Sequence, residues 1–168
     1  MENTTVKRKW ANWKFIAFII VLIAIFVKFF VLRDRDENAP VTVELDLPKV
    51  AFRSKQEVEA VLGKGKLDSY YKDEVAGCEK CPKMTYREGK IEITYINEIA
   101  DQIQLNKLSD YDFEDRVVLG ILNLKEDIKP NVDEDQLKRW DNYEKYSQIS
   151  AFGSGNDIEY ILIKAKTE

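Results

Sequence analysis

The most uniform stretch of the sequence is an apolar run near the N-terminus. Residues 15–27 carry no polar or charged side chain, and after Lys28 the run continues to Leu32. About 20 apolar residues in a helix span a bilayer core, and a helix that is apolar on every face has no amphipathic stripe for packing on a soluble core. The pattern therefore predicts a transmembrane helix over residues 15–32, with the Lys28 ammonium reaching the headgroup region.

The charged residues beside this run predict its orientation. Four basic residues precede it, and two basic residues that alternate with acidic ones follow it. Positively charged flanks stay in the cytoplasm, and no small-residue cleavage site follows the run. We expect an uncleaved anchor in the plasma membrane of a bacterium, with residues 1–14 cytoplasmic and residues 33–168 extracytoplasmic.

The residues after the anchor divide into a stalk and a domain. Two prolines and a charged start suggest a stalk over residues 33–48, with a short strand at residues 41–45. The remaining residues, 49–168, have the mixed apolar and polar pattern of a globular domain.

The first regular element of the domain is a short helix. Ser54 and Glu57 have the spacing of a capping box, in which each side chain satisfies a backbone N–H of the first turn. An apolar face follows at helical spacing, formed by Val58, Val61 and Leu62. Gly63 can adopt the left-handed conformation that ends a helix.

The apolar period then changes from helical spacing to two. Alternating apolar positions predict strands at residues 84–86, 91–95 and 99–105, separated by turns at 88–89 and 97–98. The sequence predicts one helix followed by three antiparallel strands.

A second unit repeats this order. A helix capped by Ser109 or Asp112 is expected to run to Leu122, followed by an acidic loop and by strands on both sides of the turn at residues 153–157. The fold class that we predict is α+β, with an antiparallel sheet and two helices packed on one face, built from two helix–strand units.

The first unit resembles a known pattern. In residues 52–105, a helix that carries Val58 and ends in Leu62-Gly63 is followed by a cysteine-containing loop and a hairpin. This resembles the helix–hairpin unit of small bacterial envelope proteins with the β-lactamase-inhibitory-protein-like fold, which the small lipoprotein of outer-membrane barrel assembly shares. The resemblance implies a tethered, non-enzymatic module that binds a protein or peptide.

Cys78 and Cys81 are the only cysteines, three residues apart. A zinc site needs four ligands, and the chain has no histidine and no second cysteine pair. A thioredoxin-type centre needs the first cysteine at a helix N-terminus, whereas Pro82 and a β-pattern follow the second. Outside the cytoplasm a disulfide is expected; reduced thiols without a role, or a redox function, are the alternatives.

The absence of histidine also excludes the Ser-His-Asp and Cys-His types of catalysis. Carboxylates could form a glycosidase-type pair, and the alternative is a solvated acidic surface. The residues concerned are Asp112, Glu114, Asp115, Asp133, Glu134 and Asp135. We expect no metal, no cofactor and no catalytic residue.

Residues 33–168 carry 21 basic and 29 acidic side chains, a net charge of −8. This balance disfavours nucleic acid as a partner, since no basic stripe can neutralise phosphates. Three aromatic residues beside the acidic loop, Trp140, Tyr143 and Tyr146, are the candidate binding surface, with core packing as the alternative.

The sequence thus predicts a single-pass, membrane-anchored envelope protein that binds or scaffolds another envelope protein. Two alternatives remain: a membrane-tethered thiol/disulfide protein that uses Cys78 and Cys81, and a carboxylate-dependent cell-wall hydrolase.

Overall fold

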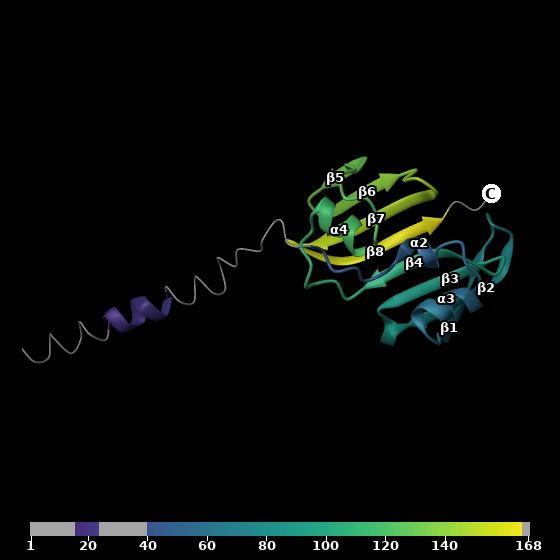
Figure 1. Cartoon of the computed structure of the whole chain (residues 1–168), viewed down its shortest axis with the longest axis horizontal. Coiled ribbons are helices and arrows are strands. Elements are labelled where there is room, and N and C mark those ends of the chain that lie inside the picture. The colour runs from purple at the N-terminus through teal and green to yellow at the C-terminus, as the bar shows by residue number, and fades with distance from the viewer. Residues whose placement is uncertain (1–15, 24–39, 166–168) are drawn as a thin grey trace, which may run out of the picture. The chain divides into compact units, whose positions relative to one another are not determined.

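The computed structural model describes residues 16–23 and 40–165, and the chain divides between Pro40 and Val41 into two compact units, of which the second is the folded domain (Figure 1). Residues 16–23 are helical and exposed. Within the described residues, no helix has both the length and the apolar character needed to cross a membrane. The rest of the predicted anchor, the N-terminal segment 1–14 and the stalk up to residue 39 lie outside the described residues.

Residues 41–165 form an α+β domain with one eight-stranded antiparallel sheet, which confirms the α+β class and the antiparallel sheet that the sequence predicts. The strands lie in the order β1-β2-β3-β4-β8-β7-β6-β5. Their bounds are β1 Lys66–Asp73, β2 Cys78–Tyr86, β3 Ile91–Ile96, β4 Ile99–Asn106, β5 Val132–Glu134, β6 Leu137–Asp141, β7 Tyr146–Ser154 and β8 Asp157–Ala165. The described helices are short: α2 Leu47–Val50, α3 Lys55–Leu62, α4 Asp115–Ile121 and the 3-10 turn η2 Arg87–Gly89.

The strand order reflects two consecutive meanders of four strands each. One meander, β1 to β4, follows α3, and the other, β5 to β8, follows α4. The meanders join where β4 pairs with β8, with Ile103 opposite Ile163 and Leu105 opposite Ile161. The last strand of each unit is therefore central in the sheet, and the first strand of each unit is at an edge.

One face of the sheet is apolar because residues opposite each other in neighbouring strands point to the same side. A row of buried side chains crosses six strands: Met84, Ile93, Ile103, Ile163, Ile149 and Trp140. The buried residues of α2, α3 and α4 belong to the same hydrophobic core as this row. The helices therefore cover this face of the sheet.

The predicted capping box of α3 is confirmed. The Ser54 hydroxyl accepts from the backbone N–H of Glu57, and the Glu57 carboxylate accepts from the backbone N–H of Ser54 at 2.9 Å. Val58 is the one fully buried residue of this helix, and Gly63 ends it at a φ of 85°. The turn at Asn97-Glu98 is also present, with both residues at positive φ.

Residues 41–48, which we assigned to the stalk, pack against the domain. No strand forms at residues 41–45, because the backbone N–H groups of Glu44 and Leu45 both donate to the carbonyl of Ile121, the last residue of α4. Leu45 and Leu47 are buried in the core. The tether is shorter than predicted, because the last residues of the predicted stalk complete the core.

The second helix starts later than the pattern predicted. Its N-cap is Glu114, without a side-chain capping bond. Asp112, one of the two predicted caps, instead forms an isolated β-bridge with Asp157. The other predicted cap, Ser109, lies in a turn.

Candidate functional site

The face of the sheet opposite the helices, which we call the open face, carries mainly polar side chains. Cross-strand register places on it Lys83, Thr85, Glu92, Thr94, Gln102, Gln104, Gln148, Ser150, Leu162 and Lys164. None of these belongs to the hydrophobic core, and no described helix contributes a core contact on this side. The open face is therefore a sheet face that carries mainly polar groups and is not covered by any described helix.

Hydrogen bonds fix several of these side chains in place. Lys83 Nζ lies 2.5 Å from a carboxylate oxygen of Glu92. The Asn106 side-chain N–H donates to the Glu92 carboxylate at 3.2 Å, and the Asn106 side-chain oxygen accepts from the Gln104 amide at 2.7 Å. This network spans β2, β3 and β4, so the polar groups are preorganised for recognition.

Two adjoining hollows lie along this face. The first, of about 210 Å³, is lined by residues of β2, β3, β4 and β8, including Lys83 and Thr94. The second, of about 600 Å³, continues toward the β1–β2 turn and Ser147. Both are lined by Tyr71, Gln102 and Lys164; we call the two together the open-face groove.

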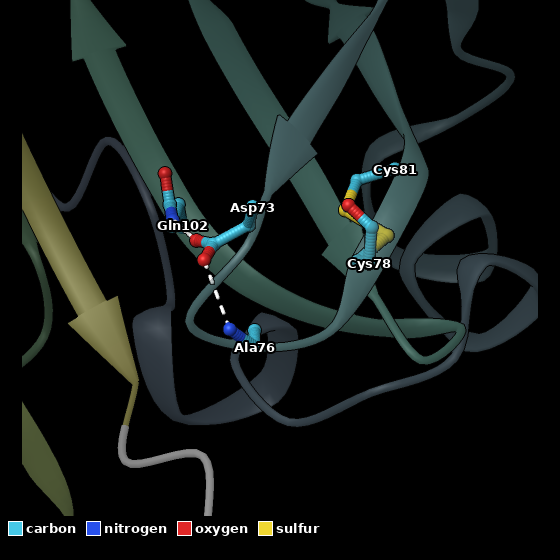
Figure 2. Close-up of a disulfide and its surroundings, with 5 residues drawn as sticks. All are labelled: Asp73, Ala76, Cys78, Cys81 and Gln102. Atoms are coloured by element: carbon cyan, nitrogen blue, oxygen red, sulfur yellow. Dashed lines mark hydrogen bonds between the residues drawn. A yellow bond between two sulfur atoms is a disulfide. The ribbon is translucent and has the colours of Figure 1, made fainter.

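Asp73 connects the β1–β2 turn to the centre of the sheet. Its carboxylate accepts from the Gln102 amide at 3.3 Å and from the backbone N–H of Ala76 at 3.0 Å, as Figure 2 shows. The turn is thereby held over one end of the open-face groove. The sequence does not indicate this contact, because Asp73 and Gln102 are 29 residues apart and β2 and β3 lie between β1 and β4 in the sheet.

The Cys78–Cys81 disulfide that the sequence predicts is present, with the two Cα atoms 5.8 Å apart (Figure 2). We expected it in a connection between the helix and the hairpin, but both cysteines lie in β2, opposite Asp73 and Tyr71 of β1. Cys81 is fully buried and Cys78 is half-buried. The bond therefore reinforces the end of a hairpin beside the open-face groove.

The three predicted surface aromatics are buried: Trp140 is 1% exposed, Tyr143 4% and Tyr146 0%. The Trp140 indole N–H donates to the Ile128 carbonyl and the Tyr143 hydroxyl to the Lys125 carbonyl, so both rings hold the acidic loop onto the core. Burial raises the pKa of Tyr143 and of Tyr146. These rings leave no exposed patch, and core packing, the alternative interpretation, describes them.

The acidic residues gather at one end of the sheet, although they come from separate segments. A hollow of about 440 Å³ is lined by Asp112, Glu114, Asp133, Glu134 and Asp135 together with Lys138. Four of these carboxylates, at positions 114 and 133–135, are exposed, which is the setting of a solvated acidic surface. In the described part of the chain, no group of acidic or cysteine side chains is arranged to hold a metal ion.

Asp115 has a separate role. Its carboxylate lies 2.9 Å from Lys138 Nζ and 3.0 Å from Lys129 Nζ. Burial opposes its ionisation, but the hydrogen bonds from Lys138 and Lys129 outweigh burial and lower the pKa of this carboxyl. Asp115 is thus an ion-pair partner between α4 and β6, with no feature of a proton donor.

The fold and the open-face groove define a class: an α+β domain with a preorganised, uncovered sheet face. No protein-family model, curated protein or solved structure matches the chain. The resemblance of residues 52–105 to the β-lactamase-inhibitory-protein-like fold stays a prediction.

Proposed function

We propose that this chain is a membrane-anchored envelope protein whose domain binds an extended segment of another protein on its open face. The apolar run at residues 15–32, of which residues 16–23 are helical, supports the anchor. The cysteine pair, oxidised in the structure, supports an extracytoplasmic domain, since disulfides persist mainly outside the cytoplasm.

The observation that carries the proposal is the open-face groove itself. It crosses the central strands of the sheet, and fixed amide and charged groups line it beside the apolar surfaces of Tyr71 and Leu162. Protein interfaces combine aromatic or apolar contacts with oriented polar groups in this way. A bound peptide would find hydrogen-bond partners in Gln102 and Gln104, and an acidic group on it would pair with Lys164.

Site-specific photo-crosslinking in cells tests this proposal. A photo-reactive amino acid at Gln104 or Leu162 on the open face should give a discrete adduct with another protein. The same amino acid at Glu59, on α3 against the other face, is the matched control and should give none. Adducts of equal yield from all three positions, or from Glu59 alone, would refute binding by the open face.

A thiol/disulfide role is a second candidate, favoured by the unequal exposure of the two cysteines. A partner thiolate could attack only the Cys78 sulfur, forming a mixed disulfide there and releasing the Cys81 thiolate into a buried site. Trapping tests it: Cys81→Ala leaves a Cys78 thiol, which should then collect disulfide-linked partners in cells. Absence of such adducts, together with normal function, would eliminate this candidate.

A further inference from the structure

The two edges of the sheet are very different. At one edge, β5 has three residues, which is typical of a protected edge. At the other edge, β1 has eight residues, and seven of them are exposed. β1 pairs with β2 only, so its outer row of backbone N–H and C=O groups has no strand partner among the described residues.

Large apolar side chains gather on this free edge. Leu67, Tyr70 and Tyr71 are each about half exposed. A long exposed strand edge that carries apolar groups is a template for pairing with a further strand.

The charge pattern of β1 is complementary to itself. If two copies of this strand pair antiparallel with Tyr70 opposite Tyr70, Asp68 of each lies opposite Lys72 of the other, and Lys66 lies opposite Glu74, the first residue of the turn after β1. Opposite charges and paired aromatic rings are the cross-strand combinations that stabilise antiparallel pairs. In this register every charged residue at the even positions from 66 to 74 lies opposite a residue of opposite charge.

Two irregularities in the pairing of β1 with β2 lie on either side of Tyr70. The ladder is irregular between Leu67 and Ser69 and again between Tyr71 and Asp73. Asp68 and Lys72, two residues on either side of Tyr70, are thus the positions that have no residue opposite them in β2. Both side chains are exposed. Among the ion pairs of the described residues, Lys72 takes part only in those with the exposed carboxylates of Glu74 and Glu79.

We propose that β1 is a homodimerisation edge, at which two copies of the chain pair antiparallel with Tyr70 on the two-fold axis. The dimer joins the two sheets edge to edge and leaves the open face of each copy uncovered. An edge contact of this length is small for a stable interface, and confinement of both copies to one membrane raises their effective concentration. The dimer does not depend on binding at the open face.

Cysteine cross-linking of the full chain in its membrane tests the geometry. In this register Tyr70→Cys places two thiols across adjacent strands, with Cα atoms about 5 Å apart. Leu67→Cys is the matched control, equally exposed at 51% against 53%, but its two copies would lie about 20 Å apart. A short bismaleimide, with the native disulfide kept oxidised, should give a dimer with Tyr70→Cys and little with Leu67→Cys.

A charge exchange tests the register. Lys72→Asp places like charges opposite Asp68 twice in each dimer and should lower the yield of the Tyr70→Cys dimer about tenfold. Adding Asp68→Lys restores opposite charges and should restore the yield. Equal cross-linking at positions 67 and 70, cross-linking to a different protein, or failure of the double exchange to restore the yield would overturn the proposal.

Discussion

Among single residues, the pair Tyr86 and Tyr95 shows how polar atoms are accommodated in this core. Both rings are buried, and their hydroxyl oxygens lie 2.7 Å apart. Burial is the largest cause that raises the pKa of each hydroxyl, so both stay protonated and one can donate to the other. A hydroxyl that loses its partner inside a protein costs free energy, because no water replaces the bond.

We predict that Tyr95→Phe lowers the free energy of unfolding by about 1–2 kcal/mol, because the Tyr86 hydroxyl loses this bond while the ring volume is kept. Denaturant unfolding monitored by circular dichroism measures the change. The matched control is Tyr160→Phe, a half-buried ring on the open face that stacks on Phe152, with an effect within about 0.5 kcal/mol. Equal effects of the two substitutions would contradict the account of the buried pair.

Glu44 makes the stability of the domain depend on pH. Its carboxylate lies 2.7 Å from Lys90 Nζ and accepts from the Tyr111 hydroxyl at 2.5 Å. Burial alone would raise the pKa of Glu44, but the hydrogen bonds from Lys90 and Tyr111 outweigh it, so the pKa is lowered from its usual 4.5. A lowered carboxyl pKa contributes stability that is present above the unfolded-state pKa and is lost as the pH falls through the folded-state pKa.

We therefore predict that the free energy of unfolding decreases as the pH falls below about 4.5 and that Glu44→Gln makes this decrease shallower. Denaturant unfolding at a series of pH values between 7 and 3 measures both. The exposed Glu134→Gln serves as the control and should keep the wild-type slope. An unchanged slope in Glu44→Gln would show that this carboxyl does not carry the pH dependence.

At the scale of elements, α3 depends on its capping box. Its first turn is exposed and only Val58 is fully buried, so local bonds matter more here than in a helix with a wide buried face. We predict that Ser54→Ala costs about 1 kcal/mol of unfolding free energy. The neighbouring Gln56→Ala, exposed in the same turn, should change stability by less than about 0.5 kcal/mol, and similar losses from both would argue against the cap.

The disulfide acts on a single hairpin. It closes a loop of four residues, so it removes little entropy from the unfolded chain, and we predict that Cys78→Ala/Cys81→Ala costs about 2 kcal/mol without loss of the fold. Unfolding curves of the wild type with and without reductant, compared with those of the double variant, measure this. A double variant that fails to fold would mean that the bond supports the whole domain.

Several elements could be predicted because they are half buried. Strands β3 and β4 alternate apolar and polar residues over most of their length since one face lies on the core, and α3 has a complete set of end signals. Strand β1 has no alternating apolar and polar pattern, because almost every residue of this edge strand is exposed and neither of its faces is buried. Helix α2 has only four residues, too few for a helical period.

At the scale of the whole molecule, the two helix–strand units could be predicted, but their joining could not. The pairing of β4 with β8 brings together residues about 60 positions apart, such as Ile103 and Ile163, and no local pattern encodes it. The open-face groove depends on this pairing, since Gln102 and Lys164 line it from the two units. The aromatic residues near the acidic loop were a weaker guide to the binding surface, because their large rings pack in the hydrophobic core.

The central claim is that an extracytoplasmic domain binds a protein segment on its open face, and single-cysteine labelling of intact cells tests it most directly. A membrane-impermeant maleimide is applied, without reductant, to cells that produce Gln104→Cys on the open face or Glu59→Cys on α3. The account predicts rapid labelling of Glu59→Cys, slow labelling of Gln104→Cys, and equal labelling of the two once the protein is purified. Equal labelling on cells would mean that the open face is uncovered, and labelling of neither until lysis would mean that the domain is not extracytoplasmic.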